Sequence, residues 1–236
     1  MDFKMPTNEN GGCNHCSISR QNILKVLNDK EIERISSCKT SSFFHKGEVL
    51  FQEGSMLSGV YCIREGICKL TKSANGKNQI VRFMGKGDVL GQREIMSEEE
   101  VKLTATALTD MQICLIEKED FLGCSTSNTN FSAEIIRYAC IELNKADDTI
   151  VNLAQKTAKQ RLVDAIFLLE KTFGVDKQGY IQIQLSREEI SGMIGVASES
   201  LTRLISELSN RKWIATRIKR IKILNKEQLL KILNDE

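Results

Sequence analysis

The sequence predicts an α+β protein made of an N-terminal β sandwich or barrel, one long helix and a C-terminal helix-turn-helix module. From Ser42 to Glu117, short stretches rich in Val, Ile, Phe and Leu are interrupted by regularly spaced glycines, a pattern typical of short strands and tight turns. Residues 131–157 then change to a helical period, and residues 186–210 have the spacing of two short helices around a glycine turn. A chain of 236 residues is also long enough for two domains.

The predicted organisation has four parts. An N-terminal cysteine-containing segment, 1–25, precedes a β-rich domain over 26–130. A long helix follows over 131–157, and a domain with the helix-turn-helix pattern lies over 158–236. Within the β-rich part we expect about eight strands, with a hairpin turn at Asn75-Gly76, because this dipeptide favours the tightest hairpin turns.

The cysteines and the apolar runs indicate where the protein works. No apolar run approaches the roughly 20 residues that span a bilayer, and the first twenty residues lack the order of a signal peptide. We therefore expect a cytoplasmic protein with no membrane partner. In that compartment the eight cysteines are more typical of core thiols, metal ligands or redox sensors than of disulfides. Cys62 and Cys68, inside predicted strands, are expected to be buried.

The helix over 131–157 carries a narrow apolar stripe at alternating steps of three and four residues, which is a heptad seam. Its members are Ile136, Ala139, Leu143, Ala146, Ile150 and Leu153. Such a seam packs either on its own domain or on a second copy. Because the stripe is narrower than a usual core-facing surface, a homodimer is the favoured interpretation.

The segment 186–210 predicts the helix-turn-helix itself. Ser186 and Glu189 have the spacing of a capping box, so a helix should begin at Arg187. A turn at Gly195-Val196-Ala197 and a second helix over 198–210 should follow. The first turn of this second helix would enter the DNA major groove and present a set of polar side chains, namely Ser198, Glu199, Ser200, Thr202 and Arg203. Arg reads guanine, Glu accepts from cytosine, and Thr contacts thymine.

Positive charge is concentrated around this motif. Residues 187–224 hold eight Lys or Arg against four Glu, whereas the whole chain carries a net charge of +2. The stretch "WIATRIKRIKIL" alternates like a hairpin and predicts a basic wing that contacts phosphates. The expected contacts are Lys212, Arg217, Lys219 and Arg220. The alternative is a helical pair with solvated charges.

Several motifs together resemble the Crp/Fnr transcription regulators. They are "FHKGEVLFQEGSMLSGVYCIREGICKL", "GDVLG", the seam helix, "AKQRLVDAIFLLE" and "REEISGMIGVASESLTRLISEL". The resemblance implies an N-terminal double-stranded β-helix (a cyclic-nucleotide-binding-like jelly roll), a dimerisation helix and a C-terminal winged helix-turn-helix. It also implies a homodimer that binds palindromic double-stranded DNA, with RNA polymerase as a further partner.

The recognition helix is similar to that of the Fnr branch. "ESLTR" resembles the branch's Glu-x-x-Ser-Arg, with Glu199 and Arg203 matching and Thr202 in place of Ser. Ser198 stands where the Crp branch usually has Arg. The resemblance therefore implies an Fnr-like half-site.

Binding of cyclic AMP is disfavoured by the same comparison. Family members that bind it use a Gly-Glu pair and an Arg followed by Ser or Thr, whereas this chain has Gln92 and Lys102-Leu103 at the corresponding places. A lysine can meet a phosphate as a point charge, but the bidentate guanidinium and the ribose-binding carboxylate are missing.

The N-terminal "CNHCSIS" resembles part of the oxygen-labile 4Fe-4S site of the Fnr branch. The resemblance implies Cys13, Cys16 and Cys114 as ligands, but Asn22 replaces the third N-terminal cysteine. Thiolates are the usual four ligands of such clusters, so a fourth must come from Cys38, His15 or a nearby carboxylate. A dithiol switch, a zinc site and reduced thiols without any cofactor remain the alternatives.

The predicted function is a DNA-binding transcription regulator of the Crp/Fnr type, not an enzyme, that responds to oxygen or redox state through the cysteine site. A regulator without a cluster, responsive to an unknown small ligand or constitutive, is the alternative. A cupin-like metalloenzyme is a remote one, because such sites need clustered histidines and the chain has just His15 and His45, far apart in sequence.

Overall fold

The computed structural model describes residues 22–74 and 76–234. Cys13, His15 and Cys16 of the predicted cysteine site lie outside these residues, as does Asn75 of the predicted hairpin turn. The chain divides into two compact units. Of the described residues, the first unit contains 22–72 and 82–143, and the second contains 73–74, 76–81 and 144–234.

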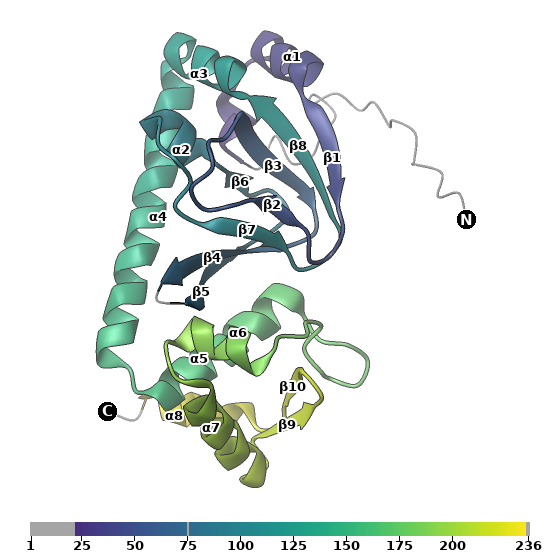
Figure 1. Ribbon diagram of the computed structural model, residues 1–236, viewed down its shortest axis with the longest axis vertical. Coiled ribbons are helices and arrows are strands. Elements are labelled where there is room, and N and C mark those ends of the chain that lie inside the picture. The colour runs from purple at the N-terminus through teal and green to yellow at the C-terminus, as the bar shows by residue number, and fades with distance from the viewer. Residues whose placement is uncertain (1–21, 75, 235–236) are drawn as a thin grey trace, which may run out of the picture. The chain divides into compact units, whose positions relative to one another are not determined.

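The N-terminal half folds as a β roll of two four-stranded sheets, visible in the upper part of Figure 1. One sheet has the order β1-β8-β3-β6 and the other has β2-β7-β4-β5. The strands are β1 (Thr40–Phe44), β2 (Val49–Phe51), β3 (Gly59–Glu65), β4 (Cys68–Ala74), β5 (Lys77–Met84), β6 (Val89–Leu90), β7 (Thr104–Ala107) and β8 (Met111–Glu117). This arrangement confirms the predicted jelly roll, and its strands run from Thr40 to Glu117, beginning two residues before the expected stretch.

Strand β8 organises the first sheet because it pairs with a neighbour on either side. Cys114 at its centre lies opposite Ser41 of β1 and opposite Cys62 of β3. Gly59 begins β3 where a side chain is impossible, since a Cβ there would lie 2.0 Å from the carbonyl oxygen of Ile116. Cys62 and Cys68 are both buried, as the sequence predicted.

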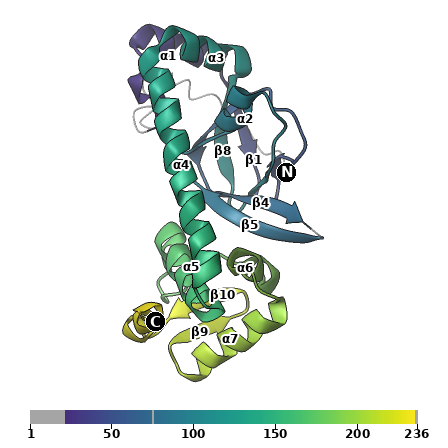
Figure 2. The same ribbon diagram turned by 90° about the vertical axis from the view of Figure 1, so that its left-hand side faces the viewer.

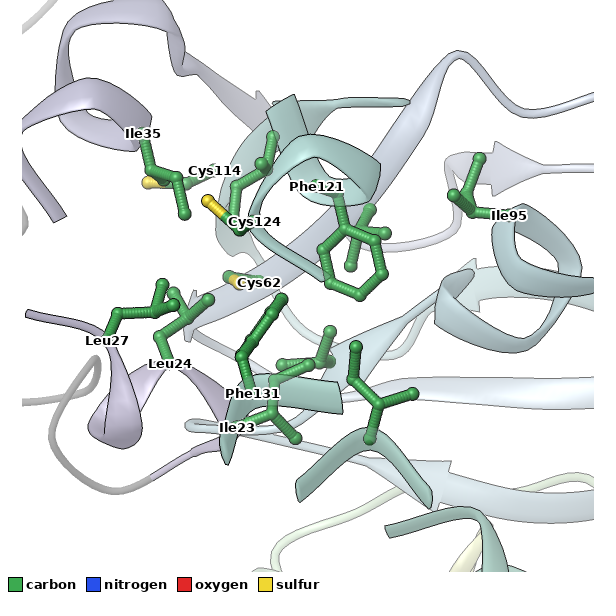
Figure 3. Close-up of a cluster of buried hydrophobic side chains, with 14 of the residues drawn as sticks. Ile23, Leu24, Leu27, Ile35, Cys62, Ile95, Cys114, Phe121, Cys124 and Phe131 are labelled. Carbon is green, nitrogen blue, oxygen red and sulfur yellow. The ribbon is translucent and has the colours of Figure 1, made fainter. Parts of the chain in front are cut away.

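Short helices close one end of the roll over an apolar core. They are the 3₁₀ helix η2 (Ile23–Val26) and the α-helices α1 (Asp29–Cys38), α2 (Gln92–Ser97) and α3 (Lys118–Ser127). Figure 3 shows the centre of this core, where Phe121 packs edge-on against Phe131 with ring centroids 5.4 Å apart. Cys62, Cys114 and Cys124 belong to the same core, together with Leu24 of η2.

The long helix α4 (Thr129–Gln155) has two different faces in its first half. Figure 2 shows this half running beside the roll. Phe131 and Ile135 are buried, and Tyr138 packs against the roll core, so burial raises the pKa of its phenol to about 12. One turn later Glu142 forms an ion pair with Arg82 of β5. The adjacent face carries the predicted seam, where Ile136, Leu143 and Ile150 are each more than 60% exposed (63%, 62% and 64%).

The second unit contains the predicted helix-turn-helix and wing. After α4 come α5 (Ala158–Phe173), α6 (Arg187–Ile194), α7 (Ser198–Asn210), β9 (Ile214–Arg217), β10 (Arg220–Ile223) and α8 (Lys226–Asn234). The ends of α5 and α6 match the glycine signals, because Gly174 and Gly195 both have a positive φ at the C-cap.

One segment of this unit has strand propensity without forming a strand. Tyr180, Ile181 and Ile183 are residue types that favour strands, but the segment makes isolated bridges, from Ile181 to Val175 and from Tyr180 to Lys222. In the turn before it, the Asp176 carboxylate accepts the backbone N–H groups of Gln178 and Tyr180. The Tyr180 N–H is therefore used within the turn and not in a strand ladder.

In the part of the chain that the structure describes, no helix combines the length and apolar character that a membrane crossing requires.

Candidate nucleic-acid interface

Helices α6 and α7 are joined as the sequence predicted. The Ser186 Oγ accepts the backbone N–H of Glu189 at 3.1 Å, and the Glu189 carboxylate accepts the N–H of Ser186 at 2.8 Å. This capping box satisfies two backbone donors that the first turn of a helix otherwise leaves free. Ser191 is small and buried where the helices meet, and its hydroxyl lies 3.1 Å from that of Ser198.

Helix α7 separates an apolar face from a polar one. Leu201, Ile205 and Leu208 are buried and hold the helix on the domain. The residues predicted to read bases are all exposed, namely Ser198, Glu199, Ser200, Thr202 and Arg203, and Glu199 and Arg203 lie on the face opposite the buried one. The Thr202 hydroxyl donates to the backbone oxygen of Ser198 at 2.9 Å, which restricts the orientation of this exposed side chain. The structure therefore gathers all five residues on the first two turns of one helix.

Charged side chains fix α7 to α5. The Lys159 ammonium donates to the Glu207 carboxylate at 2.7 Å, and Arg211 lies 3.3 Å from the same oxygen. The hydrogen bond from Lys159 lowers the pKa of Glu207. Because Glu207 is occupied in this way, its negative charge is neutralised beside the basic surface.

Arg161 links three backbone segments and was not predicted from the sequence. Its guanidinium donates to the backbone oxygens of Ile194 at 2.7 Å, Lys156 at 2.7 Å and Leu153 at 3.2 Å. The carbonyls of Leu153 and Ile194 lie near the ends of α4 and α6, where helix carbonyls lack partners within their own helix. A Cβ at Gly195 would lie 3.3 Å from Leu153, so the turn also packs closely on the end of the seam helix.

Strands β9 and β10 form the predicted wing next to α7 (Figure 1). Arg217 and Lys219 are exposed at its tip, and Lys212 is exposed in the turn between α7 and β9. Arg220 differs, because its guanidinium is bound to the Asp176 carboxylate at 2.6 Å and lies over the Tyr180 ring. The structure thus brings Lys212, Arg217 and Lys219 to the surface and gives Arg220 a partner within the domain.

The roll positions that correspond to a cyclic-nucleotide site differ from a phosphate clamp. Gln92 begins α2, and its Oε1 is buried without a hydrogen-bond partner among the described residues. Lys102 is exposed 3.8 Å from Glu99, while Leu103 packs against the roll core. The chain therefore places an apolar side chain where a hydroxyl would be needed.

Of the three predicted cysteine ligands, Cys114 is the one whose side chain lies in the described part of the chain. Cys114 is buried in the roll core, with its sulfur 3.8 Å from the Ser41 hydroxyl. Cys38 ends α1, and its side chain is outside the described part. The described residues contain no group of three or more His, Cys, Asp or Glu side chains placed to hold a metal.

Asn22, at the place of the third N-terminal cysteine, is unsuited to be a ligand. Its Oδ1 accepts the N–H of Leu24 at 2.9 Å, and it therefore caps the helix η2. Its Nδ2 is buried and has no hydrogen-bond partner among the described residues. Residue 22 therefore supplies no thiolate, and its amide is used within the fold.

The sequence matches two family models, the cyclic nucleotide-binding domain over residues 42–128 and the Crp-like helix-turn-helix domain over residues 160–232. It is 28% identical to the fumarate and nitrate reduction regulatory protein of Escherichia coli K12, over 93% of this chain and 89% of that protein. A Crp/Fnr-family regulator from Eubacterium rectale has the same fold, with a TM-score of 0.79 and 15% identity over 90% of this chain and 98% of that one.

The chain belongs to the Crp/Fnr family of transcriptional regulators. It is accordingly a DNA-binding transcription regulator and not an enzyme, and the family binds DNA as dimers. FixK2 from Bradyrhizobium japonicum shares the fold as well, with a TM-score of 0.69 and 22% identity over 82% of this chain and 96% of that one. The match to a cyclic nucleotide-binding domain covers the roll.

Proposed function

We propose that the protein binds a palindromic DNA site of the TTGAT type as a homodimer. In this proposal α7 enters the major groove, Glu199, Thr202 and Arg203 read the bases, and Lys212, Arg217 and Lys219 contact phosphates. The observation that carries it is the two-faced helix α7, whose buried leucines orient these polar side chains to one exposed surface. As a transcription regulator, the dimer would act on RNA polymerase as its protein partner.

Each base-reading residue has a chemical role. The Arg203 guanidinium has two parallel donors for O6 and N7 of guanine, and the Glu199 carboxylate accepts from a cytosine amino group. The methyl group of Thr202 suits contact with the thymine methyl. Phosphate contacts then hold the register without reading sequence.

The test is DNA affinity measured by fluorescence anisotropy with a labelled palindrome and a scrambled duplex. Arg203→Ala should weaken binding to the palindrome by about 10- to 100-fold, the usual effect of one bidentate base contact, and should change binding to the scrambled duplex little. Arg93→Ala serves as a control, because Arg93 is an equally exposed arginine of the roll, paired with Glu94. Undiminished binding by Arg203→Ala would refute the proposed base readout.

We also propose that the signal is oxygen or redox state, read by Cys13, Cys16 and Cys114. The support is the "CNHCSIS" motif together with the position of Cys114 in the core that also contains Ile23 and Leu24 of the adjoining helix. A bound 4Fe-4S cluster would supply oxygen lability there, held by these thiolates and a fourth ligand from Cys38 or His15. Cys114 would be the member of the set fixed by the roll.

Anaerobic purification followed by an absorption spectrum and iron and sulfide analysis tests this input. We expect a coloured, iron-containing protein in which Cys114→Ser lowers the bound iron. Cys68→Ser is the matched control, because burial raises the pKa of Cys68 to about 12 and keeps this thiol neutral in the other core of the roll. An iron-free protein that binds DNA equally well with and without air would exclude the cluster.

A further inference from the structure

The tip of the wing carries a large apolar side chain that is almost fully exposed. Ile218 is 87% exposed, the highest value for any large hydrophobic side chain in the described part of the chain. It is the first of the two residues, Ile218 and Lys219, that join β9 to β10, because Arg217 pairs directly with Arg220. An exposed Ile gains no stabilisation from burial within the folded chain.

The backbone at this position is also unfavourable for Ile. Ile218 has φ = 55°, and among the described residues just Glu98 and Lys212 share a positive φ without being glycine. Steric contact with Cβ makes this region costly for a β-branched residue. A two-residue hairpin turn whose first residue alone has a positive φ normally has glycine there. The described part of the chain thus has an unfavourable backbone conformation at Ile218 with little burial of the side chain to offset it, which points to a partner.

The charges around Ile218 identify the class of partner. Arg217 and Lys219 flank it, and both are exposed; Arg217 is oriented by a 3.4 Å hydrogen bond to the side-chain oxygen of Gln178. The wing lies against α7, whose exposed face holds Arg203. The wing tip thus presents an apolar side chain between two positive charges, next to the proposed recognition helix. A complementary partner is a polyanion that has apolar surface between its negative charges. The deoxyribose rings of DNA between successive phosphates have this character.

We propose that Ile218 is a DNA contact of the wing, packing on deoxyribose between the phosphates that Arg217 and Lys219 bind. This inference rests on the proposed DNA interface and extends it to an apolar residue. The contact adds affinity through burial of the side chain, with no release of counterions. Apolar side chains, Ile included, are recurrent contacts of proteins that bind the DNA minor groove.

Ile218→Gly removes both the backbone strain at the positive φ and the proposed apolar contact with DNA, and the two effects are measured separately. The variant should bind the palindrome about tenfold more weakly, since most of the burial of one Ile side chain is lost. Its thermal midpoint without DNA should rise, because glycine accepts the positive φ. The slope of log affinity against log salt should stay unchanged, whereas Lys219→Ala should reduce that slope by about one phosphate contact.

Two further variants complete the test. Glu98→Gly relieves a similar positive φ, at the end of α2 in the roll, and should leave DNA affinity unchanged. Ile218→Asn tolerates this backbone but lacks the apolar surface, so it should bind as weakly as Ile218→Gly.

Three results would overturn the inference: wild-type affinity in Ile218→Gly, restored affinity in Ile218→Asn, or a fall in the salt slope with either variant. The first would mean that the tip meets no DNA, the second that chain stiffness matters and not apolar contact, and the third that Ile218 acts by placing the neighbouring cations. Failure of the proposed DNA interface is a separate result, because it would appear as undiminished palindrome binding by Arg203→Ala.

Discussion

Asn22 illustrates how one side chain decides what a site can hold. The Asn22 amide stands where the Fnr branch has a cysteine, and its oxygen accepts the backbone N–H of Leu24 and so caps the 3₁₀ helix η2. A carbonyl oxygen is also a hard donor, and iron-sulfur clusters take soft thiolates. For this reason the proposed fourth ligand has to come from another residue.

Glu134 gives the fold a defined response to acid. Its carboxylate binds Arg137 at 2.5 Å and Lys25 at 2.8 Å, which ties η2 to the start of α4. Hydrogen bonds from Arg137 and then from Lys25 lower its pKa from 4.5 to about 2. Because the folded-state pKa is the lower one, the carboxylate contributes its full stability above about pH 4.5 and loses it as the pH falls toward about 2.

Glu134→Gln should therefore reduce stability at neutral pH and flatten the loss of stability on acidification. The loss of unfolding free energy should stay below the roughly 1.4 kcal/mol per pKa unit expected without screening, because solvent screens the charges of Arg137 and Lys25. Urea denaturation at a series of pH values measures it, with the exposed Glu33→Gln as control. Parallel pH profiles for wild type and Glu134→Gln would contradict this role.

Among the elements, α4 has two faces with clearly different surroundings. Phe131, Ile135 and Tyr138 face the roll, while the seam residues Ile136, Leu143 and Ile150 occupy the neighbouring face and are exposed in the single chain. Such a row of exposed large apolar residues is uncommon on a monomer and is typical of an interface. In a two-fold dimer the same surface of both protomers forms the interface, so a seam residue is buried in each of the two copies.

Leu143→Asp should weaken the dimer by at least about 100-fold, because each protomer loses the burial of one Leu and gains a charge in the seam. Sedimentation equilibrium measures the dissociation constant directly. Ile141→Asp is the matched control, since Ile141 is a partly exposed apolar residue of α4 outside the seam. Equal dimer dissociation constants for Leu143→Asp and wild type would place the interface elsewhere.

At the scale of the whole molecule, the fold could be predicted because each local signal agrees with its element. The period-two stretches became strands, the capping box at Ser186 began α6, and Gly174 and Gly195 ended their helices. The polar face of α7 followed from the same helical spacing, so the residues of the candidate DNA interface could be named in advance.

The remaining features depend on contacts between distant residues, and local patterns carry no signal for them. The segment around Tyr180 has strand propensity, but the Tyr180 N–H is used within the Asp176 turn. Arg161 acts through three backbone carbonyls, which any sequence possesses. Ile218 reads as an ordinary strand residue until its positive φ and its exposure are known.

Arg161 has a mechanical consequence for a regulator of this family. One guanidinium joins the end of the seam helix to the end of the first helix of the DNA-binding motif, and Gly195 rests against Leu153 beside it. These contacts lie within the second unit and hold the end of α4 directly to α6, which packs in turn on α7. We therefore expect a displacement of this end of α4 to pass to α6 and α7 through the Arg161 guanidinium.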